Sequence, residues 1–172
     1  MLALLKLLQS LVKTLHSDGT PAQIALGFAL GAALGVTPLV NLHNLAILAL
    51  LAVLNVSFAA GLLGWAVFVP IGFLLDPLFD RLGRLLLLDT PALQPLFTTL
   101  DNTPGFALAN LNNTVVLGSL VGWLLLTVPV YFLARSGVLR YRATLGARVR
   151  QTRIYSAITA SRAYNVYRWF RP

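Results

Sequence analysis

Few side chains in this sequence have the types and spacing that catalysis requires. The chain contains His16 and His43, five aspartates, and neither glutamate nor cysteine. The absence of cysteine excludes disulfides and thiolate metal sites, and no carboxylate pair, zinc motif or glycine-rich phosphate loop is present. We therefore predict a non-enzymatic protein with no catalytic residue, metal or cofactor. The alternative is a membrane enzyme that uses His43 and Asp76.

Polar residues do gather around one short apolar segment. Asn41, His43 and Asn44 lie at its start, Asn55 lies just past its end, and Asp76 follows the next apolar segment. Polar groups at membrane depth are costly and often mark a ligand or ion pathway. These five residues form the candidate polar site. The two interpretations are a ligand or proton site, and helix capping with packing.

Two further polar groups have simpler interpretations. Asp80 and Arg84 are four residues apart, which predicts a weak ion pair on one helix face. The run Asn-Leu-Asn-Asn-Thr over 110–114 predicts a polar turn and a helix cap. Substrate binding at the first group and partner recognition at the second are the alternatives.

The composition places these residues in a membrane protein. Hydrophobic residues make up 58% of the 172 residues, and charged residues make up 10%, against about 25% in an ordinary soluble domain. The mean hydropathy is +0.79. A soluble globule needs more polar groups than this to cover its surface.

The apolar segments predict an all-α integral membrane protein with a membrane domain over 1–134. In chain order, the predicted elements are an amphipathic interfacial helix over 1–16, a short Gly/Ala-rich helical hairpin over 21–54, membrane spans over 57–75 and 114–134 kinked by Pro70 and Pro129, an external loop of short amphipathic helices over 76–113, and a basic cytoplasmic C-terminal helix over 135–172. The hairpin helices are shorter than the roughly 30 Å hydrocarbon core. The hairpin is therefore either re-entrant or crosses a thinned region.

Thr-Pro and Asp-Pro pairs divide the chain, and each pair is predicted to open a helix. Thr or Asp accepts a hydrogen bond from free amides at a helix start, and proline at the first helical position loses no hydrogen bond. The pairs are Thr20-Pro21, Thr37-Pro38, Asp76-Pro77, Thr90-Pro91 and Thr103-Pro104.

Small residues repeat at four-residue spacing in the first helix of the hairpin. One ridge consists of Gly27, Gly31 and Gly35, and a second, on a nearly opposite face, consists of Ala25, Ala29 and Ala33. Small residues let helix backbones approach closely in lipid. We predict that this helix lies between two neighbours, and that the ridges serve either packing within the chain or docking of another protein or a second copy.

The positive charge is concentrated at the C-terminal end. Residues 135–172 hold nine arginines and no acid, whereas the whole chain has a net charge of +8. A basic segment after an apolar span indicates the cytoplasmic side, so we expect both termini inside the cell. Anionic lipid headgroups are the expected partners, rather than nucleic acid. The residues predicted to contact headgroups are Arg140, Arg142, Arg150, Arg153, Arg168, Arg171 and Trp169.

The sequence resembles a bacterial family of small, uncharacterised inner-membrane proteins, known only as a domain of unknown function. The residues that carry this resemblance are Thr20-Pro21, Ala25, Gly27-Phe28-Ala29, Gly31, Gly35, Thr37-Pro38, Leu42-His43-Asn44-Leu45, Val53-Leu54-Asn55, Asp76-Pro77-Leu78-Phe79, the stretch 112–120 and Arg140-Tyr141-Arg142. The Asp-Pro-Leu stretch at 76–78 and the Asn-Asn-Thr stretch at 112–114 resemble a narrower subgroup from bacteria with an outer membrane, whose gene is often paired with one for a much larger envelope protein. The resemblance implies an inner-membrane location and a large envelope partner, but no reaction.

We therefore expect a non-enzymatic inner-membrane subunit that anchors or assembles with a larger envelope protein, in a process such as lipid transport between membranes. The alternative is a small oligomeric transporter, channel or lipid-handling protein. Short half-length helices resemble the broken helices that line transport sites. Binding of nucleic acid by the basic tail and membrane-bound catalysis are the disfavoured alternatives.

Overall fold

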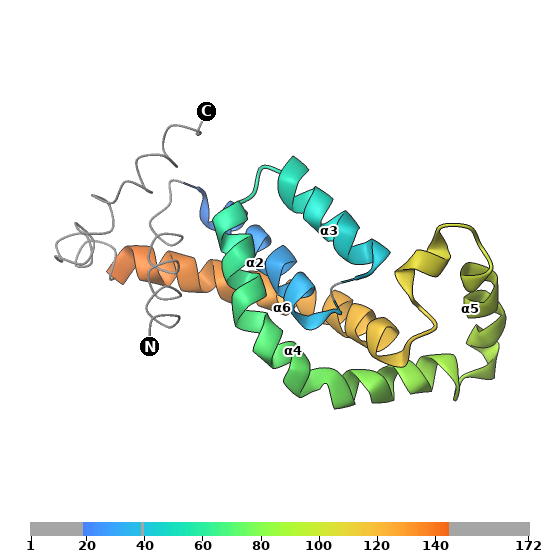
Figure 1. The fold of residues 1–172 in the computed structure, drawn as a ribbon. Helices are drawn as coiled ribbons and strands as arrows, with labels where there is room; N and C mark the ends of the chain where they lie inside the picture. The colour runs from blue at the N-terminus through green and yellow to red at the C-terminus, as the bar shows by residue number, and fades with distance from the viewer. Residues whose placement is uncertain (1–18, 39, 145–172) are drawn as a thin grey trace.

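The computed structural model describes residues 19–38 and 40–144, and this part of the chain is helical, without strands. The helices are α2 (Pro21–Val36), α3 (Leu42–Val53), α4 (Phe58–Leu87), the 3-10 helix η1 (Pro91–Leu93), α5 (Gln94–Asp101), the 3-10 helix η2 (Phe106–Ala109) and α6 (Thr114–Thr144) (Figure 1). The predicted interfacial helix over 1–16 lies outside the described residues, as does the tail beyond residue 144.

Helix α2 begins where its capping residues place it. The Thr20 hydroxyl accepts a hydrogen bond from the Gln23 amide at 3.2 Å, and the Gln23 side chain accepts one from the Thr20 amide at 2.8 Å. This capping box satisfies two backbone donors that have no partner inside the helix. The helix begins at residue 21, where the sequence predicts that the hairpin begins.

Helix α2 lies between α4 and α6. Gly27 lies against Ser57, and Gly35 lies against Trp65 and Phe68, so α2 and α4 run in the same direction. Helix α6 runs the opposite way, because Thr114 lies against Gly83 and Gly118 lies against Phe79.

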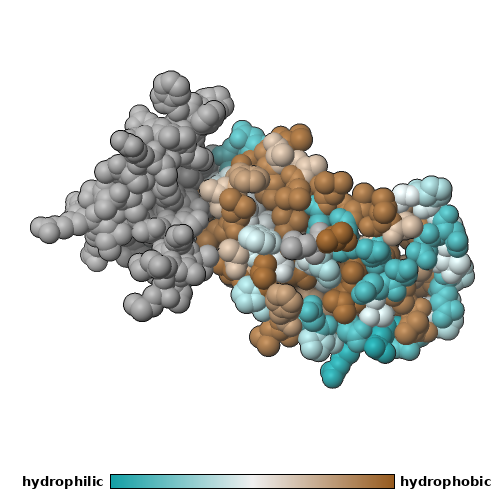
Figure 2. Space-filling view, viewed as in Figure 1, coloured by the Kyte–Doolittle hydropathy of each residue, from teal (hydrophilic) through white to brown (hydrophobic). Residues whose placement is uncertain are grey.

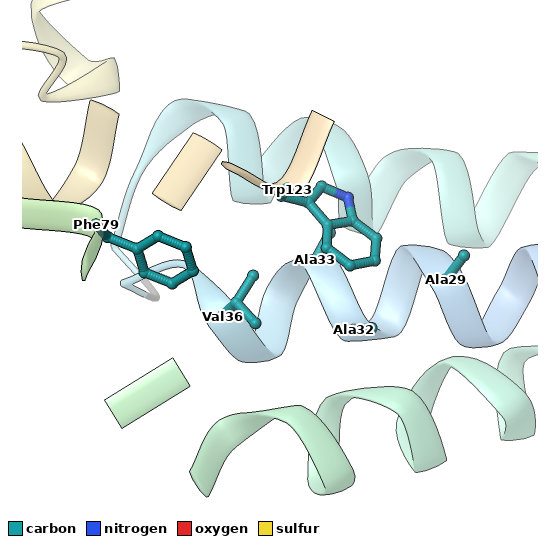
Figure 3. Close-up of a cluster of buried hydrophobic side chains, with 6 residues drawn as sticks. All are labelled: Ala29, Ala32, Ala33, Val36, Phe79 and Trp123. Atoms are coloured by element: carbon teal, nitrogen blue, oxygen red, sulfur yellow. The ribbon is translucent and has the colours of Figure 1, made fainter. Parts of the chain in front are cut away.

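The core forms where these three helices meet. Ala29, Ala33 and Val36 of α2 pack with Phe79 of α4 and Trp123 of α6 (Figure 3). All five are at most 5% exposed. Large aromatic side chains of the two neighbouring helices therefore pack against small side chains of the central helix.

Helices α4 and α6 are long and apolar enough to cross a membrane. At 30 and 31 residues, each is about 45 Å long. In the most apolar 18-residue stretch of each helix, only 28% (α4) and 33% (α6) is buried within the chain. The axis of α4 changes direction along its length (Figure 1), and Pro70 and Pro77 lie inside this helix.

The segment between α4 and α6 forms a separate arm. It contains η1, α5 and η2, which lie beyond the far end of α4 (Figure 1). Hydrophilic residues gather over this end of the molecule, and hydrophobic residues predominate nearer its middle (Figure 2). The arm is thus the polar end of an otherwise apolar helical body.

Three predicted helix starts are wrong. Pro77 lies inside α4, which continues from Phe58 to Leu87, so no helix opens at Asp76 and the boundary predicted after residue 75 is not a helix end. Proline removes a single backbone donor, and a helix held by its neighbours tolerates this loss. No helix opens at Pro38 or Pro104 either; α3 begins at Leu42, and Phe106 begins η2.

The boundary predicted between residues 134 and 135 is likewise not a helix end. Helix α6 continues through Arg135 to Thr144. Arginine is a good helix former, so a change from apolar to basic composition does not by itself end a helix. Two of the Pro pairs do precede helical segments: Thr20-Pro21 precedes α2, and Thr90-Pro91 precedes η1.

Candidate functional site

The turn between α2 and α3 is held by a buried polar network. Asn44 is 1% exposed. Its side-chain carbonyl accepts a hydrogen bond from the Thr37 hydroxyl at 2.7 Å, and its amide group donates to the Pro38 carbonyl at 2.6 Å. The same Thr37 hydroxyl lies 2.8 Å from the Ala33 carbonyl. A hydroxyl has one proton to donate, so Thr37 shares it between the end of α2 and the start of α3.

A second amide connects this turn to the segment that precedes α6. Asn110 donates to the Asn41 side-chain oxygen at 2.8 Å and to the Val40 carbonyl at 3.3 Å. Asn41 in turn donates to the Pro38 carbonyl at 2.6 Å. The backbone of Asn110 is left-handed, with φ of 51°, a conformation that asparagine tolerates better than most residues. The contact joins segments 69 residues apart.

These amides border an open hollow of about 520 Å³. Asn41, Asn110, Asn112 and Asn113 contribute to its lining, together with apolar residues of both segments. Asn113 also caps α6, because its side-chain oxygen accepts hydrogen bonds from the amides of Val115 and Val116. The hollow is thus lined by neutral hydrogen-bonding groups at the end of the molecule that carries the arm.

The candidate polar residues do not form one site. Asn41 and Asn44 lie together at the α2–α3 turn, whereas Asn55 is exposed at the other end of α3. Asn41 occupies the position before α3 but makes no side-chain capping bond. Both ring nitrogens of His43 are buried and have no hydrogen-bond partner among the described residues.

Asp76 lies in a different hollow, between α2 and α4. This hollow has a volume of about 280 Å³ and is lined mainly by apolar side chains. Thr37 and Pro38 also line it. The same turn therefore borders Asp76 and also bonds the side chains of Asn41 and Asn44. Sequence spacing alone does not place Asp76 next to the end of α2.

Asp80 links α4 to the start of α6. Its carboxylate accepts a hydrogen bond from the Thr114 hydroxyl and forms an ion pair with Arg84 at 2.8 Å. The predicted pair of Asp80 and Arg84 is therefore present. Thr114 is the partner that the sequence did not predict, because it is 34 residues away.

The small-residue ridges of α2 face partners within the chain. A Cβ atom at Gly27 or Gly31 would overlap the backbone carbonyl of Ser57 or Gly61, respectively. Conversely, a Cβ atom at Gly64 of α4 would overlap the Phe28 carbonyl of α2. The alanine ridge is buried as well: Ala25, Ala29 and Ala33 are all at most 1% exposed. Neither ridge is available to another protein in this arrangement.

The arginines predicted to contact headgroups lie partly in the described region. Arg140 is exposed on α6, and Arg142 donates to the Gly19 carbonyl at 2.8 Å, which joins the end of α6 to the start of α2. Arg150, Arg153, Arg168, Arg171 and Trp169 lie outside the described residues. Within 19–38 and 40–144, no group of three or more potential metal ligands is present.

Comparison with known proteins gives a family without an assigned activity. Residues 6–145 match the family described as "Uncharacterized protein conserved in bacteria (DUF2062)". An uncharacterized protein of Treponema pallidum (strain Nichols) is 32% identical over 152 residues, which cover 88% of this chain and 93% of that protein. No solved structure matches this chain.

Proposed function

The chain belongs to the DUF2062 family of uncharacterized bacterial proteins, and we propose that it is a non-enzymatic subunit of the bacterial inner membrane. In this proposal α4 and α6 each cross the bilayer, and the α2–α3 hairpin enters from the cytoplasmic side and returns to it. Both termini are cytoplasmic. The subunit anchors a larger envelope protein, in a process such as lipid transport between membranes.

The observation that carries this proposal is the exposure of large apolar side chains along both long helices. Phe73 and Leu74 of α4 are 76% and 80% exposed, and Leu125 and Leu133 of α6 are 71% and 72% exposed. A soluble protein rarely exposes an apolar surface this extensive, whereas lipid or a protein partner covers it without cost. A core helix of a soluble protein would instead be mostly buried.

The charge distribution supports the orientation. Arg135, Arg140 and Arg142 lie in the last turns of α6, and Asn55 and the start of α4 lie at the same end of the molecule. The arm with α5 lies at the opposite end (Figure 1). By the positive-inside rule, the arginine-rich end is cytoplasmic and the arm is external.

The packing of α2 restricts the surface that is left for the proposed partner. Both faces of α2 are occupied by α4 and α6, so the partner contacts the outward faces of the long helices, α3 or the arm. Helix α3 offers an exposed apolar surface, because Leu45 is 64% exposed and Val53 is 83% exposed. At 12 residues, or about 18 Å, α3 is too short to cross a bilayer alone.

Gentle solubilisation tests this function. The tagged full-length protein is extracted from its own host in a mild detergent after chemical cross-linking, with an unrelated inner-membrane protein of similar size as the control. We expect a larger envelope protein in stoichiometric amount that is absent from the control. A chain that is stable and functional without such a partner contradicts the proposal.

The alternative function is a lipid-handling or transport protein in its own right. It is favoured by the two short helices α2 and α3 and by the hollows on either side of their turn. Short helices with exposed ends line substrate sites in several transporter folds. Reconstituted vesicles distinguish the two functions, because flux of a lipid or ion without any added partner supports the alternative.

A further inference from the structure

The hollow between α2 and α4 combines apolar walls with one acidic side chain. Leu34 and Val36 of α2 form one wall, and Val69 and Phe73 of α4 form the other. Asp76 is the only charged residue in the lining. A volume of about 280 Å³ exceeds what a bare metal ion needs and suits a short flexible group.

Asp76 has no hydrogen-bond or ion-pair partner within residues 19–38 and 40–144. Asp80, one turn further along α4, has two partners, Arg84 and Thr114. A carboxylate beside apolar walls is costly unless a cation or hydrogen-bond donor compensates it. The hollow thus holds a partly exposed carboxylate that can accept hydrogen bonds from a cation.

Two residues that line this hollow, Leu34 and Phe73, have a backbone carbonyl that lacks its usual helical donor. Pro38 has no N–H, so the Leu34 carbonyl receives no helical hydrogen bond from it, and both residues line the hollow. Pro77 likewise offers no donor to the Phe73 carbonyl. The hollow also lies at the C-terminal end of α2, which carries the negative end of the helix dipole.

From these features we infer that the hollow binds the ammonium headgroup of an ethanolamine-type phospholipid. Asp76 accepts hydrogen bonds from the ammonium group, and the apolar walls contact an acyl chain of the same lipid. This inference rests on the proposed membrane location. Eighteen residues separate Phe58 from Asp76, about 27 Å along a helix, so with Phe58 at one membrane boundary Asp76 reaches the opposite headgroup layer.

A divalent metal is a poorer occupant of this hollow. The described residues contain no group of three or more potential metal ligands, and Ca²⁺ or Mg²⁺ requires six or more oxygens. A primary ammonium group needs only three acceptors. The two carboxylate oxygens of Asp76 are acceptors of this kind.

Lipid binding to the wild-type chain is the first test. The full-length protein in a non-ionic detergent is titrated with short-chain phosphatidylethanolamine, its N-acetylated derivative and phosphatidylglycerol, and bound lipid is counted by native mass spectrometry. The N-acetylated lipid has lost the ammonium charge. We expect about tenfold tighter binding of phosphatidylethanolamine than of the other two, the effect of one charge-assisted hydrogen bond. Equal binding of all three lipids overturns the inference.

Variants then locate the site. Asp76→Asn should abolish the preference, Asp76→Glu should keep it, and Asp89→Asn, at an exposed position beyond the end of α4, is the matched control. If Asp76→Asn does not fold, Val69→Phe tests the same hollow, because it fills the space and leaves the carboxylate. A preference that survives in folded Asp76→Asn, or in Val69→Phe where Asp76→Asn does not fold, overturns the inference.

The source of the ammonium group is tested separately. Free ethanolamine is added as a competitor, and we expect it to displace the phospholipid only weakly, because it makes no contact with the apolar walls. Displacement by free ethanolamine at lipid-like concentrations would overturn the assignment to a lipid. A chain that needs no detergent would refute the membrane proposal itself, whereas equal lipid binding by a detergent-dependent chain refutes only the lipid site.

Discussion

The hydroxyl of Thr114, the first residue of α6, donates a hydrogen bond to the carboxylate of Asp80 in α4. Just beyond, a Cβ atom at Gly83 would overlap the Thr114 carbonyl, and one at Gly118 would overlap the Phe79 carbonyl. A polar contact and two glycine contacts therefore fix where the antiparallel helices α4 and α6 meet.

Removing the Thr114 hydroxyl should loosen this junction. Thr114→Val keeps the shape of the side chain but takes one donor from Asp80, so we expect a lower midpoint of thermal unfolding in detergent. Asp80→Asn should also lower it, and the double variant should lose less than the sum of the single losses, because the two residues share one interaction. Additive losses would show that the hydrogen bond does not contribute. Circular dichroism at 222 nm measures the midpoint.

Close contact between α2 and α4 depends on Gly31. Gly31→Ala places a methyl group where the backbone of Gly61 lies, and we expect the free energy of unfolding to fall by about 1–3 kcal/mol, as for other overpacked interiors. Gly137→Ala is the control, since nothing lies within 4 Å of a Cβ atom there. That control should be neutral or mildly stabilising, because alanine favours a helix over glycine. Equal effects of the two substitutions would contradict the contact.

Asn44 should be the polar residue on which the hairpin depends most. Asn44→Ala removes the buried hydrogen bond from the Thr37 hydroxyl and one of the two donors to the Pro38 carbonyl, and we expect a loss of about 1–3 kcal/mol in the free energy of unfolding. Asn112→Ala, at an exposed residue of the amide-lined hollow, should cost little. Titration with a denaturing detergent, followed by tryptophan fluorescence, measures both. A larger loss for Asn112→Ala would refute this account of the turn.

Because the sequence contains no cysteine, single cysteines report the membrane orientation without background. Asn112→Cys lies near the arm and Asn55→Cys lies beside the start of α4, and both positions are exposed. A membrane-impermeant maleimide should label Asn112→Cys in intact spheroplasts and Asn55→Cys only after the membrane is opened. The reverse pattern would indicate the inverted topology. Labelling of both positions in intact spheroplasts would contradict the proposal that they lie on opposite sides of the membrane.

Periodic features of the sequence predicted local structure well. Four-residue spacing of Gly27, Gly31 and Gly35 predicted a helix packed closely on its neighbours, and α2 has this arrangement over the predicted range. A repeat of this kind reports a helix face directly. The pair Thr20-Pro21 also marked a true helix start, because its hydroxyl caps the helix.

Other features depend on contacts that no local pattern contains. Thr37 and Pro38 have the same types as Thr20 and Pro21, yet the Thr37 hydroxyl donates back to Ala33 and to Asn44 instead of capping a new helix. The link from Asn110 to Asn41 spans 69 residues. The positions of Asp76 beside the end of α2 and of Thr114 beside Asp80 arise from the packing of α4, which the sequence predicted as two separate segments.

The hydrogen bond from Arg142 to Gly19 has a consequence for biosynthesis. It joins the end of the last described helix to Gly19, two residues before the first, and Val138 packs with Ile24 in the same region. A nascent chain cannot close this junction until more than 140 residues have left the ribosome. Until α6 has emerged, α4 covers the glycine ridge of α2, but Ala29 and Ala33 still lack the Trp123 side chain that packs on them, so truncated translation products should be substrates for membrane quality-control proteases.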